Sequence, residues 1–380
     1  MSSSPIQALS RYLPDTNPIN NQPTTPSLRE VFETIPDPRK RRGIRHQLAD
    51  ILLICASAVM SGARSFTAIR DWADIHREVL ADTGAKPPSK HTVRRVLLLL
   101  DADQLDQLLG AWALSRTMSQ TGQDPLAVAV DGKEVRGAKN GGGQRVHLLS
   151  ACTHEQPTVI GQVSVGVKTN EIPEVETLFT QIGPAVKGKV FTFDALHCQQ
   201  STARLIHQAG AYYVFTVKAN QPRLLQRVAD LPWGQVSAGS RISKGHGRKV
   251  RRTHRVLYAP EWIDFPHAVQ VAKVRRTRTV KGKTTWEEVY VITNHPVATF
   301  EQIAAWTQGH WFIENQVHYL RDTLWDEDRS QIRTGSAPRV MATLRNTALS
   351  LLRLANATEI TRTTRYLWAN PQVATALTGL

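Results

Sequence analysis

Leu126-Ala-Val-Ala-Val-Asp131-Gly-Lys133 is an apolar run that ends in an acidic side chain. A second run of the same kind, Val190-Phe-Thr-Phe-Asp194-Ala-Leu-His197, follows later in the chain. Short apolar runs predict buried strands, and a buried strand delivers its last side chain to the carboxyl edge of its sheet. One such aspartate alone is better explained as the start of a turn. Two of them on neighbouring strands favour a mixed α/β sheet with paired carboxylates at one edge.

A third acidic residue, Glu314, lies in an aromatic, histidine-rich helical stretch, Gly309-His-Trp-Phe-Ile-Glu314-Asn-Gln-Val-His-Tyr319. His310 and His318 stand four residues before and after it, so all three share one helix face. A zinc site is the weaker interpretation, because the HExxH spacing is absent and no cysteine supports it. Packing of the histidines beside nearby tryptophans is an open alternative. Asp322 is the main rival for the third carboxylate; we prefer Glu314, which lies between aromatic residues.

Three carboxylates of this kind predict metal-dependent phosphodiester chemistry. Two divalent cations roughly 3.5–4 Å apart, bridged by carboxylate oxygens, activate the attacking oxygen and stabilise the leaving oxygen. We therefore predict that Asp131, Asp194 and Glu314 are the catalytic and metal-binding residues. His310, His318 and Arg321 are predicted to contact DNA phosphate or to hold Glu314.

The composition also favours a polyanionic partner. The 380 residues include 47 Lys and Arg against 32 Asp and Glu, a formal net charge of +15. Such an excess favours nucleic acid or an anionic membrane surface over a merely soluble basic surface. No amphipathic lipid-binding stretch or RNA motif is evident, so DNA is the expected partner, with no membrane. The three cysteines are far apart and form no disulfide pattern, which predicts a reducing, cytoplasmic compartment.

The periodicity of the chain predicts a helical N-terminal part and a mixed core. Residues 1–26, rich in Ser, Pro, Asn and Gln, are expected to form a disordered leader. Residues 27–122 are expected to form a helical DNA-binding domain, with Ser89 as an N-cap. Residues 123–221 are expected to form the first part of the catalytic core. Its predicted strands are 126–130, 145–152, 158–167, 190–193 and 212–217, with a Gly-rich turn at Lys139-Asn-Gly-Gly-Gly143.

Residues 222–297 are predicted to form a β-rich basic insertion, with strands near 254–258, 268–274 and 286–292. Arg241 to Pro260 contains seven Lys or Arg and no acidic residue. Lys244-Gly-His-Gly-Arg-Lys249 is typical of a tight turn that projects cations, although a solvated hairpin rim is the alternative. Residues 298–380 are expected to complete the core with C-terminal helices.

Basic residues are predicted to contact DNA phosphates, because Lys and Arg gain affinity by releasing counterions. Lys218-Ala-Asn-Gln221 follows a strand and is either such a contact or only a turn. Besides the three residues near Glu314, the predicted DNA-contacting residues are Arg39, Arg41, Arg42, Arg45, Arg94, Arg95, Lys218, Lys244 and Arg248.

Together these residues resemble the DDE-class insertion-sequence transposases, in the ISAs-type branch that includes the H-repeat-associated proteins. The strongest similarity is His310-Trp-Phe-Ile-Glu-Asn315 with His318, Arg321-Asp322 and Glu327-Asp-Arg329, then Arg333-Thr-Gly and Ala337-Pro-Arg. The resemblance extends to four more motifs in the core and two near the N-terminus: Val130-Asp-Gly-Lys133, Phe193-Asp-Ala-Leu-His197, Val217-Lys-Ala-Asn-Gln221 and Gly245-His-Gly-Arg248, and Ile35-Pro-Asp-Pro-Arg39 and Arg42-Gly-Ile-Arg-His46. Each motif is weak alone, but their order and spacing are specific.

The resemblance implies an RNase H-like mixed sheet core with a β-rich insertion, preceded by an all-helical domain. It implies Asp131, Asp194 and Glu314 as the triad, with two Mg²⁺ ions, or Mn²⁺, as cofactor. It implies a bacterial, nucleoid-associated enzyme that binds the terminal repeats of its element and target DNA as double strands. Pairing of two element ends implies a homodimer in the DNA complex.

The flanking residues depart from the family pattern. Related transposases carry a Tyr-Arg-Glu-Lys signature, and the corresponding positions here hold Thr307, His310, Glu314 and Arg321. Two departures keep basic character, whereas Thr307 loses the aromatic hydroxyl. The alternative to a transposase is a catalytically inactive or domesticated DNA-binding relative. Presence of all three acids argues against gross decay.

Overall fold

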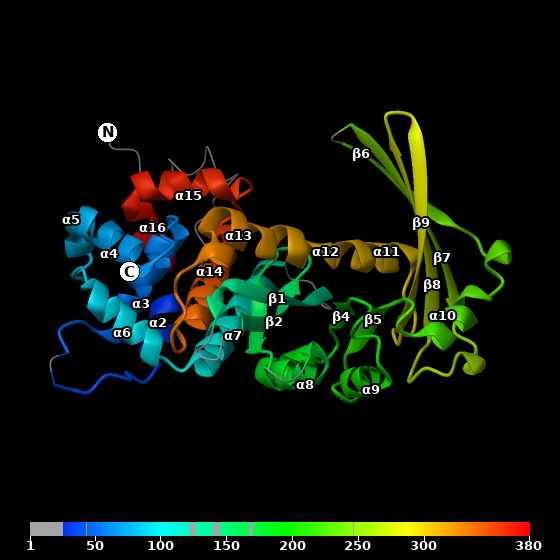
Figure 1. Ribbon diagram of the computed structural model, residues 1–380, viewed down its shortest axis with the longest axis horizontal. Coiled ribbons are helices and arrows are strands. Elements are labelled where there is room, and N and C mark those ends of the chain that lie inside the picture. The colour runs from blue at the N-terminus through cyan, green and yellow to red at the C-terminus, as the bar shows by residue number, and fades with distance from the viewer. Residues whose placement is uncertain (1–25, 43, 122–126, 140–144, 167–169, 246) are drawn as a thin grey trace. The chain divides into compact units, whose positions relative to one another are not determined.

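The computed structural model describes residues 26–42, 44–121, 127–139, 145–166, 170–245 and 247–380 (Figure 1). The expected leader and most of the expected Gly-rich turn lie outside these residues. The chain divides into two compact units. Unit 1 comprises Met1–Gln123, Gly132–Asn170 and Glu314–Leu380, and unit 2 comprises Asp124–Asp131 and Glu171–Ile313.

Unit 1 begins with six described helices. They are α2 (Leu28–Glu33), α3 (Leu48–Met60), α4 (Phe66–Ile75), α5 (Arg77–Asp82), α6 (Lys90–Leu99) and α7 (Ala102–Thr121). Serine side chains fix three of the starts. Ser27 forms a capping box with Glu30, while Ser65 and Ser89 each accept a hydrogen bond from a backbone N–H three residues on. The predicted N-cap at Ser89 is therefore confirmed.

Two helices form the centre of unit 1. Helix α3 buries every residue except Asp50, and α14 (Ala337–Leu354) buries every residue except Arg353. Helix α14 packs on α3 and α7 (Figure 1). Each fully buried aliphatic side chain there contributes about 1.5–3 kcal/mol to stability. The apolar stretch 48–60 is thus a core helix.

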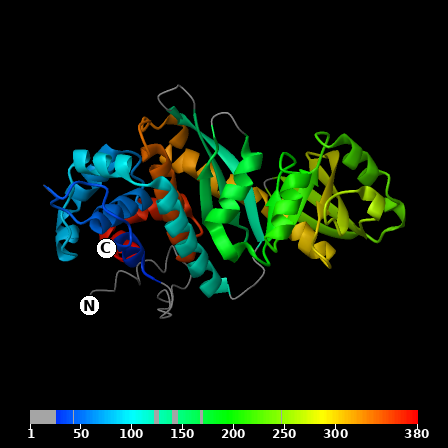
Figure 2. The same ribbon diagram turned by 90° about the horizontal axis from the view of Figure 1, so that it is seen from below.

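Three strands of unit 1 lie in the order β3-β2-β1. They are β1 (Ala127–Lys139), β2 (Arg145–Thr153) and β3 (Val159–Ser164). Strands β2 and β3 pair antiparallel with a bulge at Ala151/Cys152. Helix α7 crosses β3 closely (Figure 2), because a Cβ on Gly110 would lie 2.4 Å from the backbone oxygen of Ile160. Only glycine permits that approach.

Strand β1 is longer than the predicted 126–130. It continues beyond Asp131 to Lys139, and its side chains then alternate between buried and exposed, with Lys133 and Val135 buried and Glu134 and Arg136 exposed. The apolar run marks only the part of the strand that is buried on both faces. The alternating part carries charged residues and was not expected to be a strand.

Unit 2 contains the start of β1, then α8 (Glu171–Ile182), β4 (Val190–Phe193), α9 (Gln200–Gln208) and β5 (Tyr212–Val217). Strand β4 pairs in parallel with both β1 and β5, and α8 and α9 provide the crossovers (Figure 1). Both strands match their predicted ranges. Parallel strands covered by helices have continuously apolar sequences, which explains why β4 and β5 were easy to predict.

The insertion of unit 2 is an antiparallel meander. It contains α10 (Pro222–Ala229), β6 (Gly239–Gly245), β7 (Arg248–Tyr258), β8 (Gln270–Val280) and β9 (Lys283–Thr293), with short 3₁₀ turns at Trp233–Gln235 and Glu261–Ile263. The order is β5-β9-β8-β7-β6. Strand β6 was not expected, because nearly all of its residues are exposed and it lacks an apolar period.

The remaining helices are α11 (Phe300–Gly309) and α12 (Trp311–Ile313) in unit 2. Unit 1 then resumes with a π-helical turn (Glu314–His318), α13 (Tyr319–Trp325), a 3₁₀ turn (Glu327–Arg329), α14, α15 (Ile360–Ala369) and α16 (Pro371–Thr378). The mixed α/β class is confirmed. None of the helices in the described ranges has the length and apolar character needed to cross a bilayer.

Candidate functional site

Two predicted carboxylates lie on neighbouring strands of unit 2. In the β1–β4 pairing, Val130 is the partner of Phe193. Asp131 and Asp194 directly follow this last registered pair, so they occupy corresponding positions on strands about 4.8 Å apart. Asp131 is half-buried and Asp194 is exposed. The register brings both carboxylates to neighbouring positions, but only Asp194 follows the end of its strand, because β1 continues past Asp131 to Lys139.

His310 belongs to the same part of unit 2. It caps the C-terminus of α11, and its Nδ1 lies 3.2 Å from the hydroxyl oxygen of Thr192 on β4. Burial lowers the pKa of His310, while the negative charges of Asp131 and Asp194 oppose that shift. The imidazole therefore lies within electrostatic reach of both aspartates, beside the strand ends rather than on the surface.

The loop after Asp194 is held by a dense set of hydrogen bonds. The Leu196 N–H donates to the Asp194 carboxylate at 2.9 Å, which fixes the first turn. Asn220 donates to the Ala195 carbonyl at 2.6 Å, and Gln221 donates to the Cys198 carbonyl at 2.9 Å. The amides of the Lys218-Ala-Asn-Gln221 motif thus support this loop, while Lys218 itself is exposed.

His197 gives the same loop a buried anchor. Its ring is almost fully buried, and Nε2 lies 3.2 Å from a carboxylate oxygen of Glu171 at the start of α8. Sequence reasoning did not identify Glu171 as part of this region. Nothing in its local pattern distinguishes it from an ordinary first-turn glutamate, which favours a helix N-terminus.

Glu314 lies in unit 1, at the first residue of the π-helical turn. His318 Nδ1 is 3.2 Å from a Glu314 carboxylate oxygen. This hydrogen bond, together with the charges of His318 and Lys133, lowers the pKa of Glu314 against the opposing effect of burial. The His318 side chain is buried, whereas the Glu314 side chain remains 57% exposed. His318 therefore holds Glu314, which is one of its two predicted roles.

Asp322, the rival third carboxylate, is engaged elsewhere in unit 1. Lys133 Nζ donates to Asp322 at 2.6 Å, and the lysine side chain is 8% exposed. Burial raises the pKa of Asp322, and the Lys133 contact opposes the shift. One Asp322 oxygen is thus paired with a buried ammonium, and the side chain is 33% exposed, against 57% for Glu314.

Arg321 does not occupy a DNA-facing position. Its side chain is fully buried, and its Nε donates to Glu327 at 2.8 Å. Arg345 Nη1 donates to the other oxygen of Glu327 at 2.6 Å. The predicted phosphate contact of Arg321 is replaced by a structural ion pair, because a buried guanidinium needs an opposite charge beside it.

Arg39 is likewise internal. Its guanidinium pairs with Asp37 at 2.6 Å and also donates to the His46 carbonyl at 2.8 Å, and the side chain is only 2% exposed. Its predicted DNA contact therefore does not fit its position. The other predicted surface cations are all exposed: Arg41, Arg42, Arg45, Arg94, Arg95, Lys218, Lys244 and Arg248.

The insertion neutralises part of its own charge. Arg275 and Lys273 contact Glu288 at 2.8 and 3.0 Å, and Arg276 contacts Glu287 at 3.2 Å. These pairs face each other across β8 and β9, as cross-strand neighbours do. Lys244 and Arg248 lie instead at the β6–β7 hairpin end, with no acidic partner in the described ranges.

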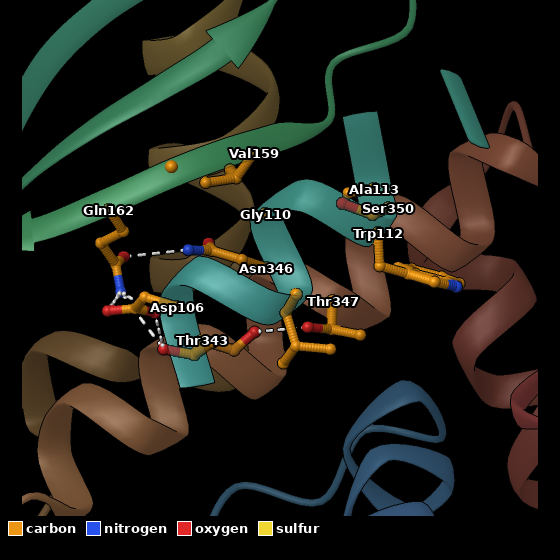
Figure 3. A pocket seen from close by; sticks show the side chains of 12 residues that line it. Asp106, Gly110, Trp112, Ala113, Val159, Gln162, Thr343, Asn346, Thr347 and Ser350 are labelled. Atoms are coloured by element: carbon orange, nitrogen blue, oxygen red, sulfur yellow. Dashed lines mark hydrogen bonds between the residues drawn. The ribbon is translucent and has the colours of Figure 1, made fainter. Parts of the chain in front are cut away.

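A polar cavity in unit 1 is structural. Figure 3 shows Asp106, Gln162, Thr343 and Asn346 joined by hydrogen bonds inside it, and Arg339 donates to Asp106 at 2.6 Å. Its volume of about 10 Å³ is no larger than a single water needs. The network satisfies buried polar groups and leaves no room for a substrate.

Carboxylate oxygens suit a hard divalent cation. Asp131 and Asp194 in unit 2 and Glu314 in unit 1 carry such oxygens, the ligands that Mg²⁺ and Mn²⁺ prefer. The three cysteines are free and buried, and burial raises the pKa of each thiol, which disfavours the thiolate that binds metals.

The sequence and the site define a DDE transposase. The chain belongs to this family, since residues 122–351 match the family described as Transposase DDE domain and residues 29–113 match the family described as DDE_Tnp_1-associated. Members of the family are DNA-cleaving and strand-transferring enzymes that use divalent metal.

The relatives agree with this assignment. "H repeat-associated putative transposase YhhI" of Escherichia coli strain K12 is 30% identical over 345 residues, covering 86% of this chain and 90% of the relative. "Putative protein YbfL" of the same strain has the same identity and coverage. A solved piggyBac transposase synaptic complex with hairpin DNA covers 91% of this chain and 76% of its own, at a TM-score of 0.43 and 10% identity, a likeness too weak to argue from.

Proposed function

We propose that this transposase binds the terminal repeats of an insertion sequence, cleaves there and joins the freed 3′-hydroxyl to target DNA, with Asp131, Asp194 and Glu314 as its triad. The observation that carries the proposal is the register of β1 and β4. It brings two aspartates, each directly after a buried apolar run, to corresponding positions beside His310.

Glu314 is the third acid of the proposed triad. It follows His310 closely in the sequence, with three residues between them. Glu314 is exposed, ionised and oriented by His318, so its oxygens are available to a ligand. Asp322 is less available, because its side chain is 33% exposed and one of its oxygens is paired with Lys133.

Asp131, Asp194 and Glu314 would hold two Mg²⁺ ions, or Mn²⁺ in their place. When bound, such a pair lowers the pKa of the attacking hydroxyl or water and stabilises the leaving oxygen. The protein contributes the rigid strand ends, the His318 contact that orients Glu314, and the hydrogen-bonded loop that positions Asp194.

The exposed cations supply the affinity for double-stranded DNA. Phosphate contacts fix the position of a protein on the duplex, and sequence is read separately at the base edges. The helical segment 27–122 would engage the terminal repeats, and the hairpin end with Lys244 and Arg248 would follow a backbone. Two element ends must be paired for strand transfer, so a homodimer would form on DNA.

The test is Mg²⁺-dependent cleavage of DNA carrying the native element ends. Wild-type protein is compared with Asp131→Ala, Asp194→Ala and Glu314→Ala, and DNA binding is measured in parallel. Loss of cleavage by all three variants, with binding retained, supports the triad. The matched control is Asp264→Ala, an exposed aspartate of the insertion that pairs only weakly with Arg227.

Two outcomes would change the proposal. Normal cleavage by Glu314→Ala would move the third carboxylate to another acid, with Asp322 first in line. Binding without cleavage by wild-type protein, in Mg²⁺ and in Mn²⁺, would favour the non-catalytic DNA-binding relative.

A further inference from the structure

A groove in unit 1 lies outside the triad region. Its walls come from the start of α4, from α6, and from the segment between α13 and α14, and its volume is about 460 Å³. The segment contains the Arg333-Thr-Gly motif, to which the triad assigns no role. Trp325 also lines it; its side chain is buried, and its indole N–H donates to the Val59 carbonyl at 2.8 Å.

Five cations line this groove, and only one acidic residue joins them. The cations are Arg64, Lys90, Arg94, Arg329 and Arg333, and the acid is Asp326. All five are exposed. Like charges gather at this density where a polyanion neutralises them, because their mutual repulsion costs stability in the free protein.

The protein itself leaves most of this charge uncompensated. Arg64, Lys90 and Arg94 form no ion pair among the described residues. Asp326 is 3.9 Å from Arg329, at the limit of an ion pair, and that arginine is 85% exposed. Arg333 uses its Nε to donate to the Gly137 carbonyl at 3.0 Å, which leaves its terminal nitrogens for another partner.

Backbone geometry adds to the positive potential. The first turns of α4, α6 and α14 contribute Phe66, Lys90 and Ala337 to the lining. The N–H groups at a helix start carry a partial positive charge that favours anions. Gly335, next to the lining residue Thr334, has φ +56°, and a Cβ there would lie 3.2 Å from the Leu98 carbonyl oxygen, so the backbone passes close to α6.

We propose that this groove binds the sugar–phosphate backbone of duplex DNA without reading its sequence. The inference extends the proposed function by naming where the duplex is held, and it does not depend on the triad. Arginine and lysine bind phosphate oxygens through charge-assisted hydrogen bonds.

The experiment measures binding of a mixed-sequence DNA duplex across a series of KCl concentrations in EDTA, so that metal plays no part. The variant is Lys90→Ala/Arg94→Ala in the full-length protein. Each lost phosphate contact reduces the slope of log affinity against log salt by about 0.9. The slope of the double variant is therefore expected to be shallower by about 2, and Arg64→Ala is expected to remove about 1.

The matched control is Arg70→Ala/Arg77→Ala. It removes the same charge from the neighbouring helices, but these arginines pair with Asp74 and do not line the groove. Its salt slope is expected to equal that of wild type. Thermal unfolding of all variants checks that the exposed substitutions leave the fold intact.

A groove variant that is folded and keeps the wild-type slope would overturn the proposal. So would a loss confined to duplexes carrying the element ends, because that pattern indicates base contacts. The binding experiment contains no divalent metal and involves no cleavage, so its outcome does not depend on the triad. Failure of the triad in cleavage is thus distinguishable from failure of the groove in binding.

Discussion

Glu314 and Glu327 both follow the last strand of the insertion and both belong to unit 1, but their surroundings are opposite. Glu327 is fully buried, with Arg321 on one oxygen at 2.8 Å and Arg345 on the other at 2.6 Å. Glu314 is 57% exposed and is contacted by a single histidine at 3.2 Å. Both carboxylates are ionised, but only one has coordination positions left.

The difference separates structure from chemistry within one short stretch of sequence. Two guanidiniums saturate the oxygens of Glu327, so this carboxylate stabilises the fold around α14 and is closed to a ligand. Glu314 is held by His318 from one side only. An acid at a functional site must be oriented without being neutralised, and Glu314 satisfies that requirement.

The largest expected effect is on catalysis at Glu314. Glu314→Gln keeps the size of the side chain but removes its charge, so we expect cleavage to fall by at least roughly a thousandfold, about 4 kcal/mol of transition-state stabilisation. Thermal unfolding should change little, because the side chain is mostly exposed. Single-turnover cleavage checks the expected loss of activity, and calorimetry checks the expected stability. Normal cleavage by Glu314→Gln would show that Glu314 has no catalytic role that distinguishes it from Glu327.

The second prediction concerns Glu327, the buried acid of this comparison. Glu327→Gln leaves Arg321 and Arg345 without an opposite charge in the interior, so we expect unfolding free energy to fall by about 3–5 kcal/mol. Urea unfolding of Glu327→Gln beside Glu314→Gln provides the measurement. Equal stability of the two variants would show that burial does not distinguish these acids.

Acid stability provides a third test. Burial would raise the pKa of Glu327, but Arg321 and Arg345 outweigh it and lower that pKa to about 2 from a model-peptide value of 4.5. The folded carboxyl thus binds its proton less readily than the unfolded one. Its contribution, about 3 kcal/mol, is present above pH 4.5 and is lost as the pH falls from there towards 2. Unfolding free energies measured across this window should show the loss in wild type and not in Glu327→Gln.

A similar difference in burial explains which strands the sequence could predict. Strands β4 and β5 were predictable because parallel strands buried on both faces are continuously apolar. Strand β6 and the end of β1 could not be predicted. Their residues are largely polar and show no apolar pattern, so only hydrogen bonding to a neighbouring strand defines them. The neighbouring positions of Asp131 and Asp194 followed from the two apolar runs, which are local features, whereas the continuation of β1 past Asp131 did not.

The burial of Arg321 and Arg39 could not be predicted in this way. Spacing places Arg321 on the helix face of Glu314, which favours a surface role. Its actual environment depends on Glu327 and on Arg345 of another helix, and no local pattern reveals that α14 covers it. Basic residues in a basic protein are therefore the least certain part of a site prediction, because pairing partners come from distant segments.

The smallest expected effect concerns the hydrogen bond between His318 and Glu314. His318 is buried and donates one hydrogen bond to Glu314, so His318→Gln should loosen the orientation of that carboxylate without removing its charge. Groups that orient metal ligands typically contribute 10- to 100-fold in affinity or activity. We expect the Mg²⁺ concentration needed for half-maximal cleavage to rise by about that factor, with the maximal rate nearly recovered at high Mg²⁺. Recovery identifies a positioning role, because a residue that only maintains the fold would lower the rate at every Mg²⁺ concentration. An unchanged Mg²⁺ dependence would mean that Glu314 is oriented without His318. The single contact that distinguishes Glu314 from the doubly paired Glu327 would then have no effect on function.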